Sequence, residues 1–340
     1  MFKLRLFTPA DVQKTSTSTS GNDLQYEIKE YYEKQLLRAA EPNLVHDQFG
    51  EKYTIPQGSG HTIEFRKFTS LAKATTPITE AVTPDGSVLN VEHITASLSQ
   101  YGDFIRTSDR LQLEAIDPII NETSKLQGAQ AGLTLNTVTR DTLAGATNKF
   151  WANGGAARSS LTASNTIQVA DIFKAVAKLR AANAPTIGGD YVAIIHPWIA
   201  NDLMTAISSS GSHVWMDVHK YAAPENIFNG EIGKLGGVRF VTSTEAKIWN
   251  DSTCPSATSP ATGYLSVFQT LIIGEKAYAV TELSGAGLEY IVKPLGYGED
   301  PLNQRASMGW KAMKTAVILD DTRMVSIEST SASAPQAAAN

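Results

Sequence analysis

The feature that most constrains the fold is a pair of alternating segments joined by a connection far longer than an ordinary β-hairpin loop. In HTIEFRKF, Ile63 and Phe65 alternate with polar neighbours, and the same period of two returns in NVEHITASLSQYGDFIRTS. The connection, TSLAKATTPITEAVTPDGS, shows no strong period and carries two prolines and an Asp-Gly turn signal. Because so long a loop is uncommon inside a compact domain, we predict that the two segments form one long β-hairpin that reaches out to contact another molecule.

The start of the chain predicts an arm. Apolar and basic residues alternate there, as in a short strand: Phe2, Lys3, Leu4, Arg5 and Leu6. Residues 15–22 are polar throughout, which favours a flexible tether, and a helix is expected over 22–41. The segment lacks the continuous apolar stretch of a secretory signal.

The segment DPIINETSKLQGAQAGLTLNTVTRDTLAGATN, residues 117–148, is typical of one long helix. Ile119, Leu126 and Leu133 recur every seven residues and predict its apolar face. If continuous, this helix would be about 45 Å long at 1.5 Å per residue. Its glycines and threonines weaken the intrinsic helix propensity, so we expect packing against a long surface, such as a sheet, to stabilise it.

Helices and strands alternate in the remainder of the chain. VADIFKAVAKLRAAN predicts a helix, DYVAIIHP a buried strand, and WIANDLMTAI a second helix. GVRFVTS and GYLSVFQTLIIGEKAYAVTEL predict strands, and MGWKAMKTAVILDDTRMVSIES predicts a hairpin that turns at Asp320 and Asp321. The composition of residues 331–340 is typical of a flexible tail.

Composition and charge limit the classes of function. The chain has 340 residues, of which 42% are hydrophobic, enough for one substantial core or for two. A net charge of −5 argues against binding nucleic acid through a basic face, because such binding needs several cationic side chains on phosphates. No apolar run reaches membrane-spanning length. The lone Cys254 cannot form an internal disulfide, which fits a reducing compartment.

Motifs for catalysis or cofactor binding are scarce. The chain lacks a P-loop and a G-x-S-x-G elbow, and GSGHT at Gly58 is more typical of a turn than of a phosphate site. The spacing of His213 and His219 does not place them on one helical face as metal ligands, and Cys254 has no basic neighbour to lower its pKa. We therefore expect no cofactor and no metal.

His196 is the candidate for an enzymatic site. It ends a predicted buried strand, a position where α/β enzymes often carry catalytic groups. No carboxylate lies near it in the sequence, and a histidine that caps the strand end is the other interpretation. An α/β enzyme with a site near His196 would require a deep pocket beside this side chain.

The arm, the over-long hairpin and the long helix all point away from a compact core. Exposed strand edges and apolar arms are liabilities in a monomer. They become stable if neighbouring copies cover them by strand addition and arm exchange. The pattern therefore favours a self-assembling protein, with a surface-layer or tail component as an alternative to a shell.

The order of these segments resembles the major capsid proteins of tailed bacteriophages. YVAIIHPWIANDL, VWMDVHKYAAPENIFNGEIGKLGGVRFV and MGWKAMKTAVILDDTRMVSIES carry the resemblance, which is to the branch typified by coliphage N-four and spans about residues 25–330. It implies the α+β fold of the Hong Kong 97 type. The implied parts are an N-terminal arm (1–50), an extended β-hairpin loop (51–107), a long spine helix with a peripheral β-sheet (108–165), an α/β axial domain (166–290), peripheral return strands (291–330) and a flexible tail (331–340).

The same resemblance implies a non-enzymatic major capsid protein, made in the bacterial host cytoplasm, that self-assembles into pentamers and hexamers. These would form the icosahedral head shell of the virion and enclose double-stranded DNA without sequence-specific binding. Portal, scaffolding and decoration proteins are the further partners that it implies, and no membrane is involved.

Within this hypothesis, apolar residues of the arm and hairpin are candidate self-assembly contacts: Phe2, Leu4, Leu6, Phe65, Phe68, Ile94 and Leu98. NGEIGKLGGVRFV predicts a tight turn between a helix and a strand, where glycines permit positive φ. Glu231 and Lys234 are expected there as surface charges that pair across copies, each pair contributing a fraction of a kcal/mol. Such weak contacts suffice when one subunit touches many neighbours.

Overall fold

The computed structural model describes residues 36, 39–40, 44–56, 58, 60–69, 71–78, 80, 83, 86–114, 119–209, 215–217, 227–256, 263–283, 287–297 and 300–340. The chain divides into two compact units. Unit 1 comprises residues 1–44, 100–136 and 286–313, and unit 2 comprises residues 45–99, 137–285 and 314–340. Helix α3 (Ile119–Ala144) and strand β14 (Arg305–Ile318) each continue from one unit into the other.

In unit 1, a small sheet packs against α3. The first part of β14 pairs with β13 (Glu289–Lys293) and with β4 (Ser99–Ser108), and α2 (Asp109–Glu114) follows β4. The core of this unit is formed by Leu36, Ala131, Leu135, Tyr290, Met308, Trp310 and Ala312. Helix and sheet are also joined by hydrogen bonds, because Gln127 donates to the carbonyl of Met308 and Gln130 accepts from the Trp310 indole.

The buried face of α3 differs from the predicted one. Leu126 is 68% exposed and Leu133 37% exposed, so the leucine stripe does not face the core. Small and polar residues are buried instead: Thr123, Ser124, Gln127, Ala131, Asn136 and Thr139. Small side chains allow neighbouring backbone to approach closely, and two of the buried polar groups have partners outside the helix: Gln127 donates to the Met308 carbonyl and Thr139 to the Asp47 carboxylate.

Unit 2 contains an eight-stranded sheet with the order β5-β15-β11-β6-β9-β8-β7, and β10 pairs with β11. Its strands are β5 (Lys149–Trp151), β6 (Tyr191–Ile195), β7 (Met216–Asp217), β8 (Glu231–Leu235), β9 (Val238–Thr242), β10 (Ile248–Trp249), β11 (Val267–Ile273) and β15 (Met324–Thr330). The pairs β6–β9 and β5–β15 are parallel, and the other pairs are antiparallel. The short 3-10 helices are η3 (Val45–Asp47), η4 (Ala152–Gly154), η5 (Arg158–Ser160) and η8 (Asp321–Arg323).

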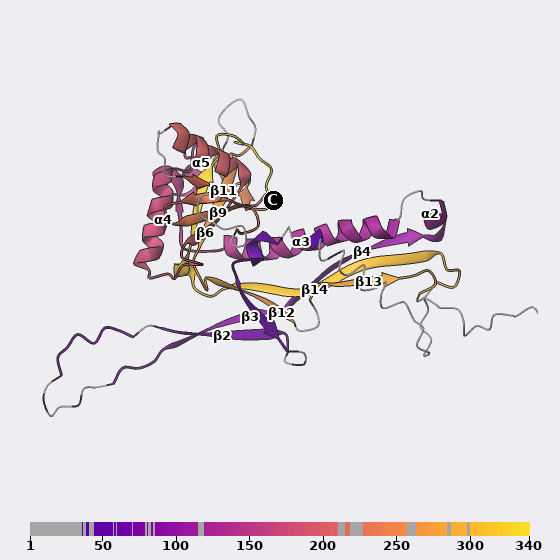
Figure 1. The fold of residues 1–340 in the computed structure, drawn as a ribbon, viewed down its shortest axis with the longest axis horizontal. Coiled ribbons are helices and arrows are strands. Elements are labelled where there is room, and N and C mark those ends of the chain that lie inside the picture. The colour runs from indigo at the N-terminus through magenta and orange to yellow at the C-terminus, as the bar shows by residue number, and fades with distance from the viewer. Residues whose placement is uncertain are drawn as a thin grey trace, which may run out of the picture. The chain divides into compact units, whose positions relative to one another are not determined.

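Strand β6 lies at the centre of this sheet and is buried on both faces. Its side chains alternate between two apolar clusters: Tyr191, Ala193 and Ile195 in one, Val192 and Ile194 in the other. Helices α4 (Val169–Ala181) and α5 (Pro197–Ser209) contribute to the first cluster and cover one face (Figure 1). Leu143 of α3 and Tyr278 contribute to the second. The predicted buried strand in DYVAIIHP is thereby confirmed.

A second set of strands in unit 2 corrects one prediction. Strand β1 (Glu51–Ile55) is parallel to β12 (Tyr278–Leu283), which is antiparallel to the last part of β14. Strands β14 and β15 do not form the predicted hairpin at Asp320, because β14 pairs with β12 and β15 with β11. Asp320 instead caps η8 by accepting hydrogen bonds from Thr322, where the chain changes sheets.

Strands β2 (Thr62–Phe68) and β3 (Val91–Ser97) form a separate two-stranded ribbon. Figure 1 shows them side by side, with their connection continuing beyond the paired residues. The hairpin is shorter than the predicted span of 51–107, because β1 pairs with β12 and β4 pairs with β14.

The C-terminal residues also differ from expectation. Composition predicted a flexible tail over 331–340, but Asp202 of α5 accepts hydrogen bonds from Ser331, Ala332 and Ser333. The buried carboxylate therefore holds the start of the tail against unit 2, which the composition of the tail alone could not indicate.

Most of the predicted arm lies outside the described residues, which begin at residue 36. Also outside are the arm contacts and two histidines: Phe2, Leu4, Leu6, His213 and His219. Leu36 and Ala40 are helical and buried.

Candidate functional site

The two faces of the β2–β3 ribbon differ in exposure. On one face Phe65 lies opposite Ile94, and alternate residues of β2 are half-buried. On the other face Phe68 lies opposite Val91, and Phe68 is 60% exposed. Aromatic and β-branched pairs across strands stabilise a ribbon of this kind, typically by roughly 0.2–1 kcal/mol each. The alternation leaves one face of the ribbon half-buried and the other face in water.

Two contacts anchor the ribbon to the body of unit 2. The rings of Tyr53 and Phe65 meet edge to face, with centroids 5.0 Å apart. Lys67 Nζ lies 3.1 Å from Asp320 Oδ1, beside η8. Burial by itself would raise the pKa of Asp320, but hydrogen bonds from Thr322 and Lys67 outweigh it, so this pKa lies below its ordinary value of 3.8.

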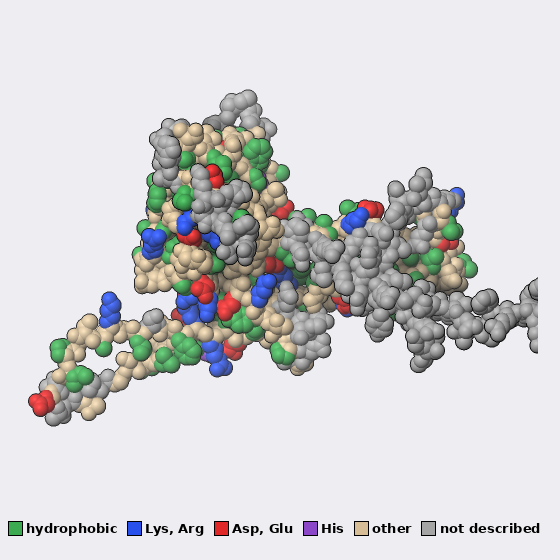
Figure 2. Space-filling view, viewed as in Figure 1, with side chains coloured by type: hydrophobic (Ala, Val, Ile, Leu, Met, Phe, Trp, Pro, Cys, Tyr) green, Lys and Arg blue, Asp and Glu red, His purple; other side chains and the backbone are tan. Residues whose placement is uncertain are grey.

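Beyond these anchors, the ribbon connection (the described residues between 69 and 90) is exposed and carries several apolar side chains. Leu71 is 58% exposed, Ile78 77% and Val88 78%. Figure 2 shows hydrophobic side chains distributed along the ribbon. Burying such a side chain is worth roughly 1.5–3 kcal/mol relative to leaving it in water. A run of exposed apolar residues on a projecting segment is typical of a contact surface.

The β8–β9 hairpin holds the two charges predicted to pair across copies. Glu231 is only 9% exposed, and its carboxylate accepts hydrogen bonds of 2.7 and 2.5 Å from Arg239. Lys234 Nζ lies 2.7 Å from Asp190. The prediction that Glu231 is a surface charge is therefore wrong, because Arg239 from the adjacent strand neutralises it inside the subunit. Lys234 is half-buried and likewise engaged within its own subunit.

The turn of this hairpin also differs from the prediction. Gly236 and Gly237 have φ of 62° and 86°, which confirms the expected positive φ at these two glycines. The turn joins two strands, β8 and β9, and not a helix and a strand.

His196 is buried at the junction of β6 and α5. Its Nδ1 accepts a 3.2 Å hydrogen bond from the backbone N–H of Trp198, and its ring centroid lies 5.2 Å from that of Phe268. Burial lowers the pKa of the imidazole. Among the described residues, no carboxylate forms an ion pair with it. The geometry is that of a cap at the start of α5.

The thiol of Cys254 is 4% exposed, and burial raises its pKa. Within the described ranges, no three acidic, histidine or cysteine side chains gather as a metal centre would require. The helices in the described part of the chain do not combine the length and hydropathy needed to span a bilayer.

A family model described as phage capsid protein matches residues 92–327. The chain belongs to this phage capsid protein family. It is a major capsid protein, a structural subunit of the virion shell. No curated protein matched the sequence.

Solved capsids share the fold of this capsid protein at low sequence identity. The capsid of Ralstonia phage GP4 matches with a TM-score of 0.71 at 12% identity, and the match covers 97% of this chain and 98% of the GP4 chain. The Cyanophage Pam1 capsid has a TM-score of 0.59 at 11% identity, with 98% and 100% covered. An encapsulin complex from Synechococcus elongatus has a TM-score of 0.54 at 10% identity, with 89% and 93% covered.

These likenesses confirm the α+β fold of the Hong Kong 97 type for this capsid protein. The narrower resemblance to the coliphage N-four branch stays a prediction. A capsid protein uses its surfaces for assembly. The exposed ribbon is therefore its candidate functional site.

The predicted contact residues of the ribbon differ in exposure. Phe65, Ile94 and Leu98 are half-buried near the base, whereas Phe68 is largely exposed. Their part in contacts between copies stays a prediction. Sequence reasoning missed the more exposed apolar residues of the connection: Leu71, Ile78, Val88 and Leu89. The available signal was their presence in a polar, proline-containing loop, where no core can bury them.

Proposed function

We propose that this capsid protein assembles with copies of itself into pentamers and hexamers that close into an icosahedral shell around double-stranded DNA. The observation that carries the proposal is the exposure of Leu71, Ile78 and Val88 on the ribbon connection. A free subunit leaves these side chains in water, and a neighbouring copy that covers them recovers their burial free energy. Each subunit repeats the contact, so modest single contacts add up to a stable shell.

The net charge of the subunit is consistent with DNA as the enclosed cargo. A formal net charge of −5 gives little general affinity for phosphates, so densely packed DNA would not adhere strongly to the shell wall. We propose that DNA is enclosed without sequence-specific binding. A portal, a separate scaffolding protein and decoration proteins are the further partners of such a shell.

The ribbon contact is tested by placing charges on the exposed connection. We expect Ile78→Asp combined with Val88→Asp to leave the subunit folded, since both side chains are exposed, and to abolish shells seen by electron microscopy. Thr75→Asp combined with Thr76→Asp is the matched control, because it adds two charges to the same exposed loop without removing an apolar side chain. Ile78→Leu should assemble normally.

Normal shells from the doubly charged variant would refute the ribbon contact. A small monodisperse species from the unaltered protein, at every salt and protein concentration, would instead favour the alternative hypothesis of an α/β enzyme with a site near His196.

A further inference from the structure

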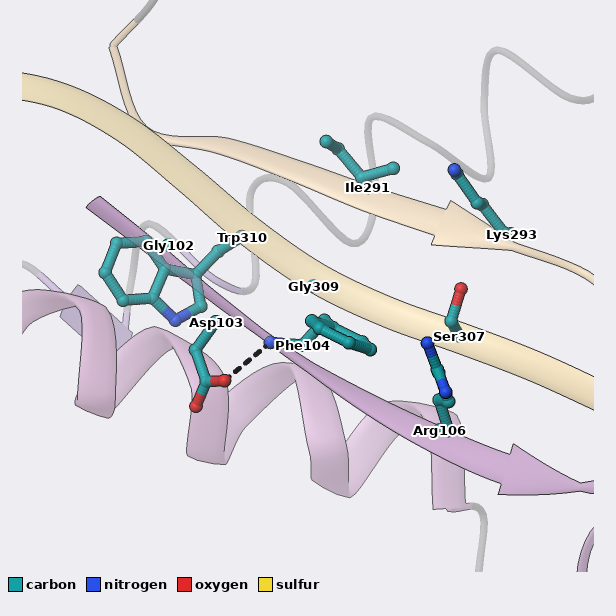
Figure 3. Close-up of a pocket in the computed structure, with 9 residues that line it drawn as sticks. All are labelled: Gly102, Asp103, Phe104, Arg106, Ile291, Lys293, Ser307, Gly309 and Trp310. Carbon is teal, nitrogen blue, oxygen red and sulfur yellow. Dashed lines mark hydrogen bonds between the residues drawn. The ribbon is translucent and has the colours of Figure 1, made fainter. Parts of the chain in front are cut away.

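The sheet of unit 1 carries a cavity on the face opposite α3. In β4, the carboxylate of Asp103 accepts a hydrogen bond from Gln130 of α3. Because successive side chains of a strand point to opposite faces, Phe104 and Arg106 point away from α3. The cavity has a volume of about 420 Å³, and its lining includes Phe104, Arg106, Ile291, Lys293, Ser307 and Gly309. Figure 3 shows these residues on three neighbouring strands, β4, β14 and β13.

Two glycines allow the strands beneath the cavity to approach each other closely. A Cβ atom at Gly102 would lie 2.6 Å from the carbonyl oxygen of Trp310, and one at Gly309 would lie 2.8 Å from Cβ of Phe104. Strands β4 and β14 approach so closely that neither position has room for a side chain. The ring of Phe104, 57% exposed, and the half-buried Ile291 form the apolar floor beside them.

Two cations lie in the row of side chains next to this floor, with Ser307 between them. Arg106 belongs to β4 and Lys293 to β13, and β14 lies between them with Ser307 opposite Lys293. Their backbones are therefore separated by two strand spacings, roughly 10 Å. Arg106 lies over the Phe104 ring at 5.0 Å, and Lys293 over the Tyr297 ring at 5.1 Å. No described carboxylate forms an ion pair with either cation.

We propose that this cavity binds an acidic peptide segment of a partner protein, with an apolar side chain between two acidic ones. In an extended peptide, side chains at alternate positions point to one face about 6.8 Å apart. An acid-x-apolar-x-acid segment that crosses the strands can place its acids on Arg106 and Lys293 and its apolar side chain above Ser307, beside Phe104 and Ile291. Ser307 supplies a hydroxyl donor on the same side. The charges are complementary, and the apolar floor adds the burial that an ion contact alone lacks.

Nucleic acid fits this cavity less well. Affinity for nucleic acid rests on several phosphate contacts, whereas this cavity offers two cations on a chain of net charge −5.

The test uses the full-length protein and a fluorescein-labelled nonapeptide with aspartate, leucine and aspartate at alternate positions among serines. Fluorescence anisotropy at low salt should show saturable binding that Arg106→Glu or Lys293→Glu weakens by about tenfold or more. Lys125→Glu is the matched control: it makes the same charge change on an exposed side chain of α3, and binding should stay unchanged. Circular dichroism checks each variant, and Lys293→Gln, at the exposed edge strand, serves if a charge reversal impairs folding.

Three results would overturn the proposal. Equal binding of the same peptide with asparagine in place of aspartate would remove the role of the cations. Tighter binding of an oligo-deoxythymidine of about 20 nucleotides, lost in the same variants, would identify a nucleic-acid site. A particle reconstruction in which a second copy of this chain fills the cavity would make it an interface between subunits.

Discussion

Gly132 of α3 lies directly against Ala40: a Cβ atom at position 132 would be 2.5 Å from the carbonyl oxygen of Ala40. One turn earlier, a Cβ at Gly128 would be 2.6 Å from the carbonyl oxygen of Leu36. Leu36 and Ala40 are themselves helical and buried. The two glycines thus form a groove on α3 that admits the backbone of an adjoining helical segment.

Gly132→Ala is expected to destabilise the subunit although alanine favours helices. The gain in helix propensity is about 1 kcal/mol, but the methyl group would collide with backbone, which cannot rotate away, and overpacking typically costs roughly 1–3 kcal/mol. Urea denaturation should show a net loss of unfolding free energy. Gly86→Ala, where a Cβ meets nothing within 4 Å, is the control. A more stable Gly132→Ala protein would contradict the close packing.

Lys67→Ala should loosen the ribbon without unfolding the subunit. The ion pair with Asp320 is partly exposed, so its loss costs only a fraction of a kcal/mol of global stability. Hydrogen exchange in β2 and β3 should nevertheless accelerate, because one of the two described anchors is lost. Lys73→Ala, on the exposed connection, should leave that exchange unchanged. Equal exchange in both variants would mean that Lys67 does not anchor the ribbon.

Acid should release the same anchor. The folded-state pKa of Asp320 lies below 3.8, so the carboxylate contributes stability that is fully present above 3.8 and is lost as the pH falls through the folded value. A spin label at Thr76→Cys should show constant mobility from neutral pH to about pH 4 and greater mobility below it. The acid step should shrink in Lys67→Ala. An unchanged step in that variant would assign it to other groups.

Glu231→Gln should be among the more destabilising single changes in the β8–β9 hairpin. It leaves the Arg239 guanidinium buried without its counter-charge, which typically costs roughly 3–5 kcal/mol. Lys234→Ala breaks a more exposed pair with Asp190 and should cost less than about 1 kcal/mol. Chemical denaturation compares the two variants. Equal, small losses would show that Glu231 and Arg239 do not form a buried pair in solution.

Asp202→Ala should free the C-terminal tail. Its carboxylate accepts from two hydroxyls and one backbone N–H, and a hydrogen bond to a charged group contributes about 1.5–3 kcal/mol. Limited proteolysis should remove the tail from the variant faster than from the unaltered protein. Asn201→Ala removes one exposed hydrogen bond to Ser333 and should behave nearly as the unaltered protein does. Equal protection in Asp202→Ala would contradict the clamp.

Local patterns predicted much of the secondary structure. The alternation around Phe65 indicated β2, the apolar run ending at Ile195 indicated β6, and the Asp-Pro start preceded α3. The wrong predictions concern partners. The residues near Asp320 looked like a hairpin turn, yet the strands on either side of it pair in different sheets. Leu126 and Leu133 looked like a core stripe, yet the face with Gly128 and Gly132 is the one that packs.

The candidate site shows the same division. The sequence predicted that a projecting hairpin exists and that apolar residues lie along it, and the family motifs indicated a capsid protein. It could not locate the Lys67–Asp320 anchor or the cavity between Arg106 and Lys293, because these residues are far apart in the chain.

The amino-acid order by itself therefore determined where strands and helices form, since those depend on the period of side chains only a few residues apart. Tertiary structure alone decided which strands share a sheet, which face of α3 is buried, and which charges meet. Those outcomes depend on burial and electrostatics between segments that approach one another only after folding. Glu231 is an example: it was expected to be a surface charge that pairs across copies, and the neighbouring strand supplied Arg239 instead.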